Sequence, residues 1–166
     1  MTSDDPDSPL RIAPSRAARA SRLRVIVTDG RGRRKAAPGL PAWLAGLAPR
    51  SAAGEVVVAL VGDRKMRDLN RRFQAIDKVT DVLSFPADPV PAGLSPAPPH
   101  CLGDIVIATG RAARQARAVG LTESEEWRRL ALHGLLHLLG YDHERDDGEM
   151  ERLERRLRRR GGLPVN

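Results

Sequence analysis

The chain contains a single cysteine, Cys101, and aromatic residues make up only 3% of its 166 residues. One cysteine cannot form an intramolecular disulfide, which fits a reducing cytoplasm, and it removes thiolate clusters from the possible zinc sites. Because aromatic residues are scarce, the core has to be built from Val, Leu, Ile and Ala. No apolar run is long enough to span a bilayer, and the N-terminal segment has no apolar signal core. We therefore expect a cytoplasmic protein without a membrane partner.

Basic residues outnumber acidic ones, and the formal net charge is +7. A charge of this sign favours a polyanionic partner, of which nucleic acid is the default candidate. The basic residues are almost all arginine, however, and Ala, Arg, Gly and Pro are abundant together, a combination that coding bias also produces. Charge alone therefore leaves the question of nucleic-acid binding open.

Apolar patterns alternate between strand-like and helix-like periods along most of the chain. β-branched and apolar runs predict strands at 23–29, 55–61, 80–86 and 102–109. Helical periodicity and capping signals predict helices at 41–47, after Asp63, at 111–119, after a Thr122–Glu125 capping box and at 147–160. We predict a single domain at residues 21–160, of α/β (mixed α+β) class, in which a small mixed sheet of about four strands packs with about five helices. A disordered tail at 1–20 is expected to precede it, and a C-terminal tail at 161–166 to follow it.

Two of these helices have predicted caps or buried faces. Asp63 stands where it can cap the helix that follows it. The buried stripe of that helix is predicted from apolar residues at i, i+3 and i+7, namely Met66, Leu69 and Phe73. In the last helix the same reasoning predicts a stripe made by Met150, Leu153 and Leu157, while its many arginines form a solvated face.

Three of the four histidines lie within residues 133–143. His133 and His137 are four residues apart, so on a helix both imidazoles project from one face. Gly140 follows the apolar run, where a helix commonly ends in a left-handed residue that glycine adopts without strain. The chain can then turn back and bring His143 towards the same point. Three neutral imidazoles that converge in this way suit a zinc ion with an open fourth position.

The same ligand spacing occurs in the His-Glu-x-x-His-x-x-Gly-x-x-His motif of zinc peptidases. In those enzymes the residue after the first histidine is a glutamate that acts as general base, whereas this chain has Gly134 there. Glycine cannot transfer a proton. A zinc peptidase therefore stays an alternative that the ligand spacing favours and that Gly134 and the basic charge disfavour.

Four segments recur together in one known family. In chain order they are Leu69-Asn70, Thr80-Asp81-Val82-Leu83-Ser84-Phe85-Pro86, Leu102-Gly103-Asp104-Ile105-Val106-Ile107 and the stretch from His133 to His143. They resemble the YbeY family of bacterial rRNA maturation factors, which are zinc-dependent, single-strand-specific endoribonucleases. The last segment is the most specific, because it includes the glycine after the first histidine and the Tyr-Asp pair before the third.

The resemblance implies one zinc ion bound by His133, His137 and His143, on a zincin-like metal helix within a mixed fold of about four strands. It implies single-stranded RNA as substrate, notably ribosomal RNA near the 3′ end of the small subunit. It also implies the ribosome or its small subunit as a partner and a role in ribosome quality control. A DNA partner is not expected.

The segment at 73–80 departs from the family pattern. The family typically has an arginine, a lysine and a proline where this chain has Gln74, Ile76 and Val79. The family arginine is the implied phosphate contact, so Gln74 occupies a candidate catalytic position without its charge. Neighbouring basic residues can supply that charge and are therefore the candidate RNA-binding residues: Arg71, Arg72 and Lys78. The departure favours a second alternative, a non-catalytic ribosome-assembly factor that binds RNA and holds zinc as a structural element.

Proton transfer needs a group other than Gly134. Asp142 is a candidate catalytic residue, as the acceptor for a ligand imidazole or as a base, and capping of the Tyr141–His143 turn is an equally open role for it. Ser84 is a second candidate. It lies with Asp81 in a strand whose end can face the metal, and both residues can instead only stabilise a turn.

Overall fold

The computed structural model describes residues 22–88, 93 and 100–165; the predicted N-terminal tail at 1–20 lies outside these residues. The described part contains the strands β1 (Leu23–Asp29), β2 (Gly54–Val61), β3 (Val82–Pro86) and β4 (Cys101–Ala108). Its helices are α1 (Leu40–Leu47), α2 (Asp63–Gln74), α3 (Thr109–Val119), α4 (Glu123–Leu138) and α5 (Glu149–Arg160). The prediction of one small α/β domain with about four strands and five helices is confirmed.

The four strands form one mixed sheet in the order β1-β2-β4-β3. β1, β2 and β4 run parallel, and β3 pairs antiparallel with β4, with Ser84 opposite Ile105. Helical crossovers are needed between parallel strands, and they place helices on both faces of the sheet. β3 lies at one edge of the sheet, so one of its two backbone edges is not paired within the sheet.

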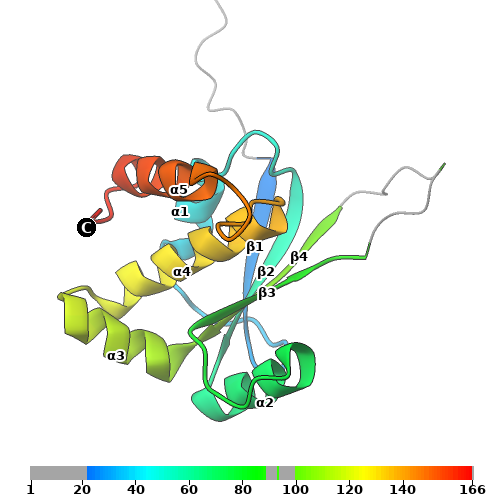
Figure 1. The fold of residues 1–166 in the computed structure, drawn as a ribbon, viewed down its shortest axis with the longest axis vertical. Helices are drawn as coiled ribbons and strands as arrows, with labels where there is room; N and C mark the ends of the chain where they lie inside the picture. The colour runs from blue at the N-terminus through cyan, green and yellow to red at the C-terminus, as the bar shows by residue number, and fades with distance from the viewer. Residues whose placement is uncertain (1–21, 89–92, 94–99, 166) are drawn as a thin grey trace, which may run out of the picture.

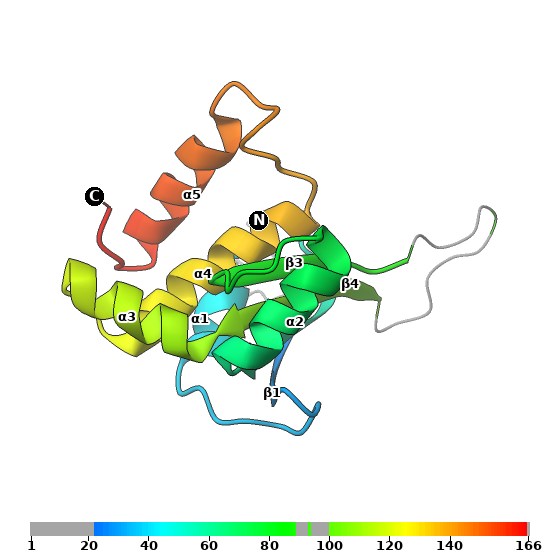
Figure 2. The ribbon, with the colours of Figure 1, turned by 60° about the horizontal axis from the view of Figure 1, so that its bottom comes forward.

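Helices cover the two faces of the sheet unequally. α1, α4 and α5 lie on one face and α2 lies on the other (Figure 1, Figure 2). The larger core fills the α4 side, where fully buried Val58 and Ile105 of the sheet meet Leu132 and Leu135 of α4. The smaller core lies beneath α2, around Met66.

The start of α4 is fixed by the predicted capping box. The Thr122 hydroxyl accepts a hydrogen bond from the Glu125 backbone N–H at 3.2 Å, and the Glu125 carboxylate accepts one from the Thr122 N–H at 2.8 Å. Such a cap stabilises a helix by about 1 kcal/mol. Gly120, in the left-handed region with φ 73°, ends α3 just before it. The helix that carries two of the histidines therefore begins at a defined point.

The predicted details of α2 are wrong at both ends. Asp63 is the first residue of α2 rather than its cap, and its carboxylate instead accepts hydrogen bonds from the Arg111 backbone N–H at 3.0 Å and from Arg114 at 2.8 Å in α3. Phe73 was expected in the buried stripe but is 57% exposed. The last turn of α2 reaches the edge strand, where the Phe73 ring meets the Phe85 ring edge-on, 5.1 Å between centroids, and stays largely uncovered.

α5 begins two residues later than the predicted Asp147. The Asp146 carboxylate accepts hydrogen bonds from the Gly148 and Met150 backbone N–H groups, both at 2.9 Å, and so supplies the cap from outside the helix. Met150 and Leu157 are buried against the larger core and Leu153 packs beside them, as predicted. No helix in the described part of the chain combines the length and apolar character needed to cross a membrane.

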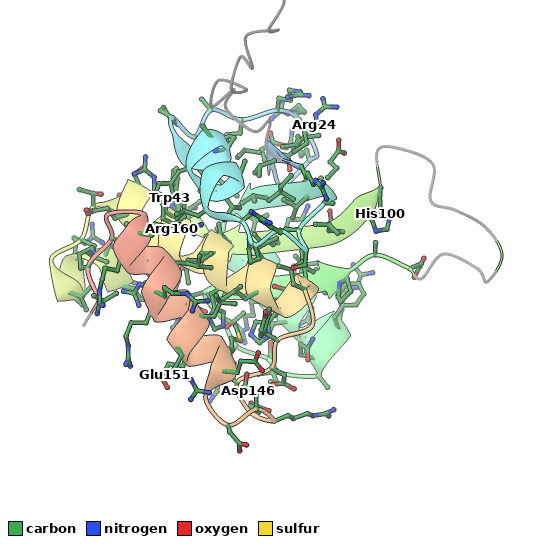
Figure 3. The ribbon with its side chains drawn as sticks, turned by 90° about the horizontal axis from the view of Figure 1, so that it is seen from above. Arg24, Trp43, His100, Asp146, Glu151 and Arg160 are labelled. Atoms are coloured by element: carbon green, nitrogen blue, oxygen red, sulfur yellow. The ribbon has the colours of Figure 1, made fainter. Side chains whose placement is uncertain are left out.

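The chain after α5 folds back onto α1. The Trp43 indole N–H donates to the Gly161 carbonyl at 2.8 Å, and Arg160 donates to the Leu47 carbonyl at 2.8 Å (Figure 3). A Cβ at Gly161 would lie 2.4 Å from Leu47 Cδ1, so only glycine permits this approach. Part of the predicted C-terminal tail, 161–166, is therefore packed against the domain.

Candidate metal centre

The structure brings His133, His137 and His143 into one cluster. A ligand nitrogen from each lies within 4.8 Å of the others, and the two helical Nε2 atoms are 3.1 Å apart. Zinc–nitrogen bonds of 2.0–2.1 Å in a tetrahedral arrangement place ligand nitrogens about 3.3 Å apart. The Nε2 atoms of His133 and His137 already match that spacing. His143 lies on an exposed turn, where rotation of its side chain can shorten the distance from its ring nitrogen to the other two. The three residues therefore fit a small divalent ion.

A tight turn after α4 delivers His143 to the cluster. α4 ends at Leu138, and Gly140 adopts a φ of 95°, a left-handed conformation that a side chain would strain. The Gly140 N–H donates to the His137 carbonyl at 3.0 Å, and the Tyr141 N–H donates to the Leu136 carbonyl at 3.1 Å. These bonds occupy the last carbonyls of the helix and reverse the chain direction. Gly140 therefore has the predicted role.

Gly134 faces the sheet rather than the cluster. A Cβ at this position would lie 2.7 Å from Ile105 Cγ2 and 3.0 Å from Ser84 Oγ, closer than atoms of a packed interior approach. α4 thus lies so close to β3 and β4 that only glycine fits at their contact. A glutamate there would be driven between helix and sheet. The position that carries the general base in zinc peptidases serves here as a packing contact.

Glu154 of α5 contacts His133 at the ring nitrogen that points away from the other histidines. His133 Nδ1 lies 3.1 Å from Glu154 Oε2, and the carboxylate side chain is only 14% exposed. Burial alone raises the pKa of the Glu154 carboxyl, but the hydrogen bond with His133 and the charges of His133, Arg158 and Arg129 outweigh it and lower that pKa below its usual value. Sequence reasoning missed Glu154. The available signal was a carboxylate four residues after Met150 and three before Leu157, on the apolar face of α5.

The surroundings of His137 favour the neutral form of its imidazole. Burial lowers its pKa below the usual value of a histidine, and the neighbouring His133 and His143 lower it further. These effects outweigh the hydrogen bond with the Tyr141 backbone and the charge of Asp142, which raise the pKa. A neutral imidazole keeps the lone pair that a metal requires.

The two remaining candidates near the histidines make structural contacts. The Ser84 hydroxyl donates to the Gly134 carbonyl at 3.2 Å, directly beside His133 on α4. The Asp142 carboxylate accepts from the Glu144 N–H at 3.0 Å and pairs with Arg145 at 3.4 Å, so it caps its own turn. A catalytic role for either residue stays a prediction. Asp81 contacts Gln115 of α3 at 3.1 Å.

The candidate RNA-binding residues lie on the other side of β3, in the last turn of α2 and the loop that follows. The side chains of Gln74, Arg71, Arg72 and Lys78 are all exposed. Arg71 pairs with Asp68 at 3.1 Å, and buried Asn70 donates to the Lys78 carbonyl at 2.9 Å and so fixes the loop. Among the described residues, no hydrogen bond or ion pair joins these four to the histidine cluster. Their part in RNA binding stays a prediction.

Taken together, these features define a small mixed α/β domain with a three-histidine cluster that could hold a metal ion. Two histidines project from one helix, a third follows a glycine turn, and the helix packs beside an antiparallel edge strand of a mixed sheet. The donor set contains only imidazole nitrogens, which suit zinc, copper, iron and nickel rather than magnesium or calcium.

Known proteins share both the sequence and the fold. A family model described as Endoribonuclease YbeY matches residues 42–161, and the chain belongs to the YbeY family. A protein from Myxococcus xanthus described as Endoribonuclease YbeY is 50% identical over 105 residues, which cover 62% of this chain and 35% of that protein. A protein of the same description from Campylobacter fetus is 41% identical over 124 residues, covering 75% of this chain and 87% of that protein.

A solution structure of TM1509 from Thermotoga maritima has the same fold. It superposes with a TM-score of 0.53 at 25% sequence identity, covering 80% of this chain and 85% of that one. The matched part of the chain spans about a third of the length of the Myxococcus xanthus relative. The activity of those relatives is therefore carried to this chain only as a proposal.

Proposed function

We propose that this chain is a zinc-dependent, single-strand-specific endoribonuclease. Its place would be the cytoplasm, in the maturation of ribosomal RNA near the 3′ end of the small subunit and in ribosome quality control, with the small subunit as partner. The observation that carries the proposal is the convergence of three histidine nitrogens within 4.8 Å in a YbeY-family chain. The names of its relatives, which describe endoribonucleases, point to RNA as the substrate class.

His133, His137 and His143 would hold the ion. When bound in such a site, zinc lowers the pKa of a water molecule to about 7 and polarises a phosphoryl oxygen. Burial and the neighbouring histidines lower the pKa of His137 and so favour the neutral form that can bind an ion. Asp142, which directly precedes His143, and Ser84, which contacts the carbonyl of Gly134 beside His133, are the groups that would accept or donate a proton.

Charge for binding the phosphates would come from the last turn of α2. Gln74 is neutral, while Arg71, Arg72 and Lys78 around it are exposed and cationic. Exposed cations bind phosphate without reading the base, which suits a nuclease that recognises single strands rather than a long sequence.

The absence of the family arginine at Gln74 favours one second candidate, an RNA-binding assembly factor in which zinc is structural. A peptidase is the weaker alternative. Gly134 lies on the face of α4 that contacts the sheet, so there is no room at this position for the side chain of a general base.

Incubation of the purified full-length chain with end-labelled single-stranded ribosomal RNA separates these functions. We expect cutting that stops when a chelator removes the metal and resumes when zinc is restored. The His137→Ala variant, purified in the same way, controls for contaminating ribonucleases. RNA binding without cutting would overturn the nuclease proposal in favour of the assembly factor, and equal cutting by the variant would assign the activity to a contaminant.

A further inference from the structure

A carboxylate behind a metal-binding imidazole decides which ring nitrogen faces the metal. An ionised carboxylate only accepts hydrogen bonds, so the proton of a neutral His133 lies on Nδ1, the nitrogen 3.1 Å from Glu154. The lone pair then lies on Nε2, which is the atom that faces His137 Nε2 at 3.1 Å. The contact therefore prepares His133 in the tautomer that can bind the ion.

Glu154 is itself held in place by charged groups that connect three helices. Arg129 of α4 and Arg158 of α5 lie near enough for their charges to act on its carboxyl group. Arg129 is fixed by fully buried Glu126, to which its Nε donates at 2.9 Å, and Glu126 also accepts from Gln115 of α3 at 3.1 Å. A carboxylate in this network keeps its position without help from solvent.

We propose that Glu154 is a positioning residue of the metal centre, which fixes the tautomer and the ring orientation of His133 through one hydrogen bond. The inference rests on the proposed zinc site. It extends the functional unit to α5, which contributes none of the three metal-binding histidines. Outer partners of this kind commonly change metal affinity by about 10- to 100-fold.

Two substitutions of Glu154 test the proposal in the full-length chain. Glu154→Met keeps the size of the side chain and removes the acceptor, so zinc affinity measured by chelator competition should fall about 10- to 100-fold. Glu154→Gln keeps an acceptor oxygen without the charge, so its affinity should lie between that of Glu154→Met and that of the wild type. In nitrogen NMR of the metal-free protein, the Nδ1–H tautomer of His133 should dominate in the wild type and be lost in Glu154→Met.

Glu151 provides the matched control. It lies on the same helix (Figure 3). Its side chain is 69% exposed and pairs with Arg155 rather than with a residue of the histidine cluster. Glu151→Met should leave zinc affinity unchanged within twofold. If Glu154→Met and Glu151→Met bind zinc equally, or if Glu154→Met leaves the His133 tautomer unchanged, Glu154 has no positioning role. A wild-type chain that binds no zinc would instead contradict the proposed metal site itself.

A second, independent observation concerns Phe73. It is the one exposed residue among the aromatic side chains, all of which lie in the described part of the chain. Phe85 meets one side of its ring edge-on, and the Arg72 guanidinium lies 5.6 Å from its centroid. An exposed aromatic ring beside a cation is the usual stacking platform for an unpaired base.

Phe73 is also connected to the metal centre across the edge of the sheet. Phe85 follows Ser84 in β3, and Ser84 contacts Gly134, the neighbour of His133. Because β3 is an edge strand, an RNA strand that crosses this edge can reach Phe73 on one face and the histidines on the other. We infer that Phe73 stacks on an unpaired base of the RNA substrate; the inference rests on the proposed function.

A 2′-O-methyl RNA oligonucleotide with one 2-aminopurine, which resists cleavage, tests this stacking. Binding should quench the 2-aminopurine fluorescence in the wild type, and Phe73→Leu should remove the quenching and weaken binding about tenfold. Ile76→Ala is the control, because Ile76 is a nearby exposed apolar residue without an aromatic face. Equal losses in both variants, or quenching that survives Phe73→Leu, would exclude stacking, whereas a wild type that binds no RNA would overturn the proposed function as well.

Discussion

Gly134→Ala is expected to destabilise the fold by about 1–2 kcal/mol, although alanine is the better helix former. In an open helix position the change from glycine to alanine stabilises by about 1 kcal/mol. At Gly134 the new methyl group would lie 2.7 Å from Ile105 Cγ2, and Ile105 is fully buried. Overpacking of this kind costs about 1–3 kcal/mol and outweighs the helix propensity. Gly134→Glu should cost about 4 kcal/mol or more, because it also buries a charge.

Gly46 is the matched control for this prediction. It lies in the exposed side of helix α1, and a Cβ there would meet nothing within 4 Å. Gly46→Ala should therefore stabilise the protein, by about 0.5–1 kcal/mol. Urea unfolding followed by circular dichroism measures all three variants. If Gly134→Ala proved as stable as Gly46→Ala, α4 would be able to shift away from the sheet without lowering the free energy of unfolding.

His137→Ala is expected to strip the metal. Structural zinc sites contribute about 10–16 kcal/mol, so loss of one of three protein ligands should weaken zinc binding about a thousandfold. His137 is the central ligand in this respect, since its ring lies 4.7 Å from that of His133 and 5.3 Å from that of His143. Mass spectrometry of metal content after dialysis should find close to one zinc per chain in the wild type and almost none in the variant.

His100 supplies the control for that experiment. It is the fourth histidine of the chain and does not belong to the cluster. Its contact with the sheet is made by its backbone carbonyl, which accepts a hydrogen bond from the Glu55 N–H, so the substitution leaves that contact in place. His100→Ala should retain the metal in full. Stoichiometric zinc in His137→Ala would mean that the ion binds elsewhere.

The sequence predicted most elements of this structure, because their signals are local. β1 and the capping box of α4 follow from patterns of a few neighbouring residues. Histidine spacing and a helix-ending glycine are equally local, so the convergence of His133 and His137 with His143 was accessible. The contacts that were missed join distant parts of the chain. Glu154 lies 21 residues from His133, and Asp63 contacts α3 48 residues away.

The two wrong details of α2 have the same origin. Asp63 has the sequence signature of a cap, but the N-terminus of another helix competes for its carboxylate. Phe73 has the periodicity of a core residue, but the sheet ends at β3 before it can be covered. Periodicity identifies the face of a helix that points inward and does not tell how far the sheet beneath it extends.

The close contact between Gly134 and Ile105 has a consequence for how the metal centre responds to mutation. His133 precedes Gly134 and His137 follows it by three residues, so the two ring nitrogens keep their distance from β4 only as long as α4 does. An enlarged side chain in the core beneath would displace both imidazoles together, away from the ring on the following turn. If the proposed metal site holds zinc, the amount of bound zinc becomes a sensitive measure of core packing. We then expect a chain with a slightly misfitted core to lose the ion before it unfolds.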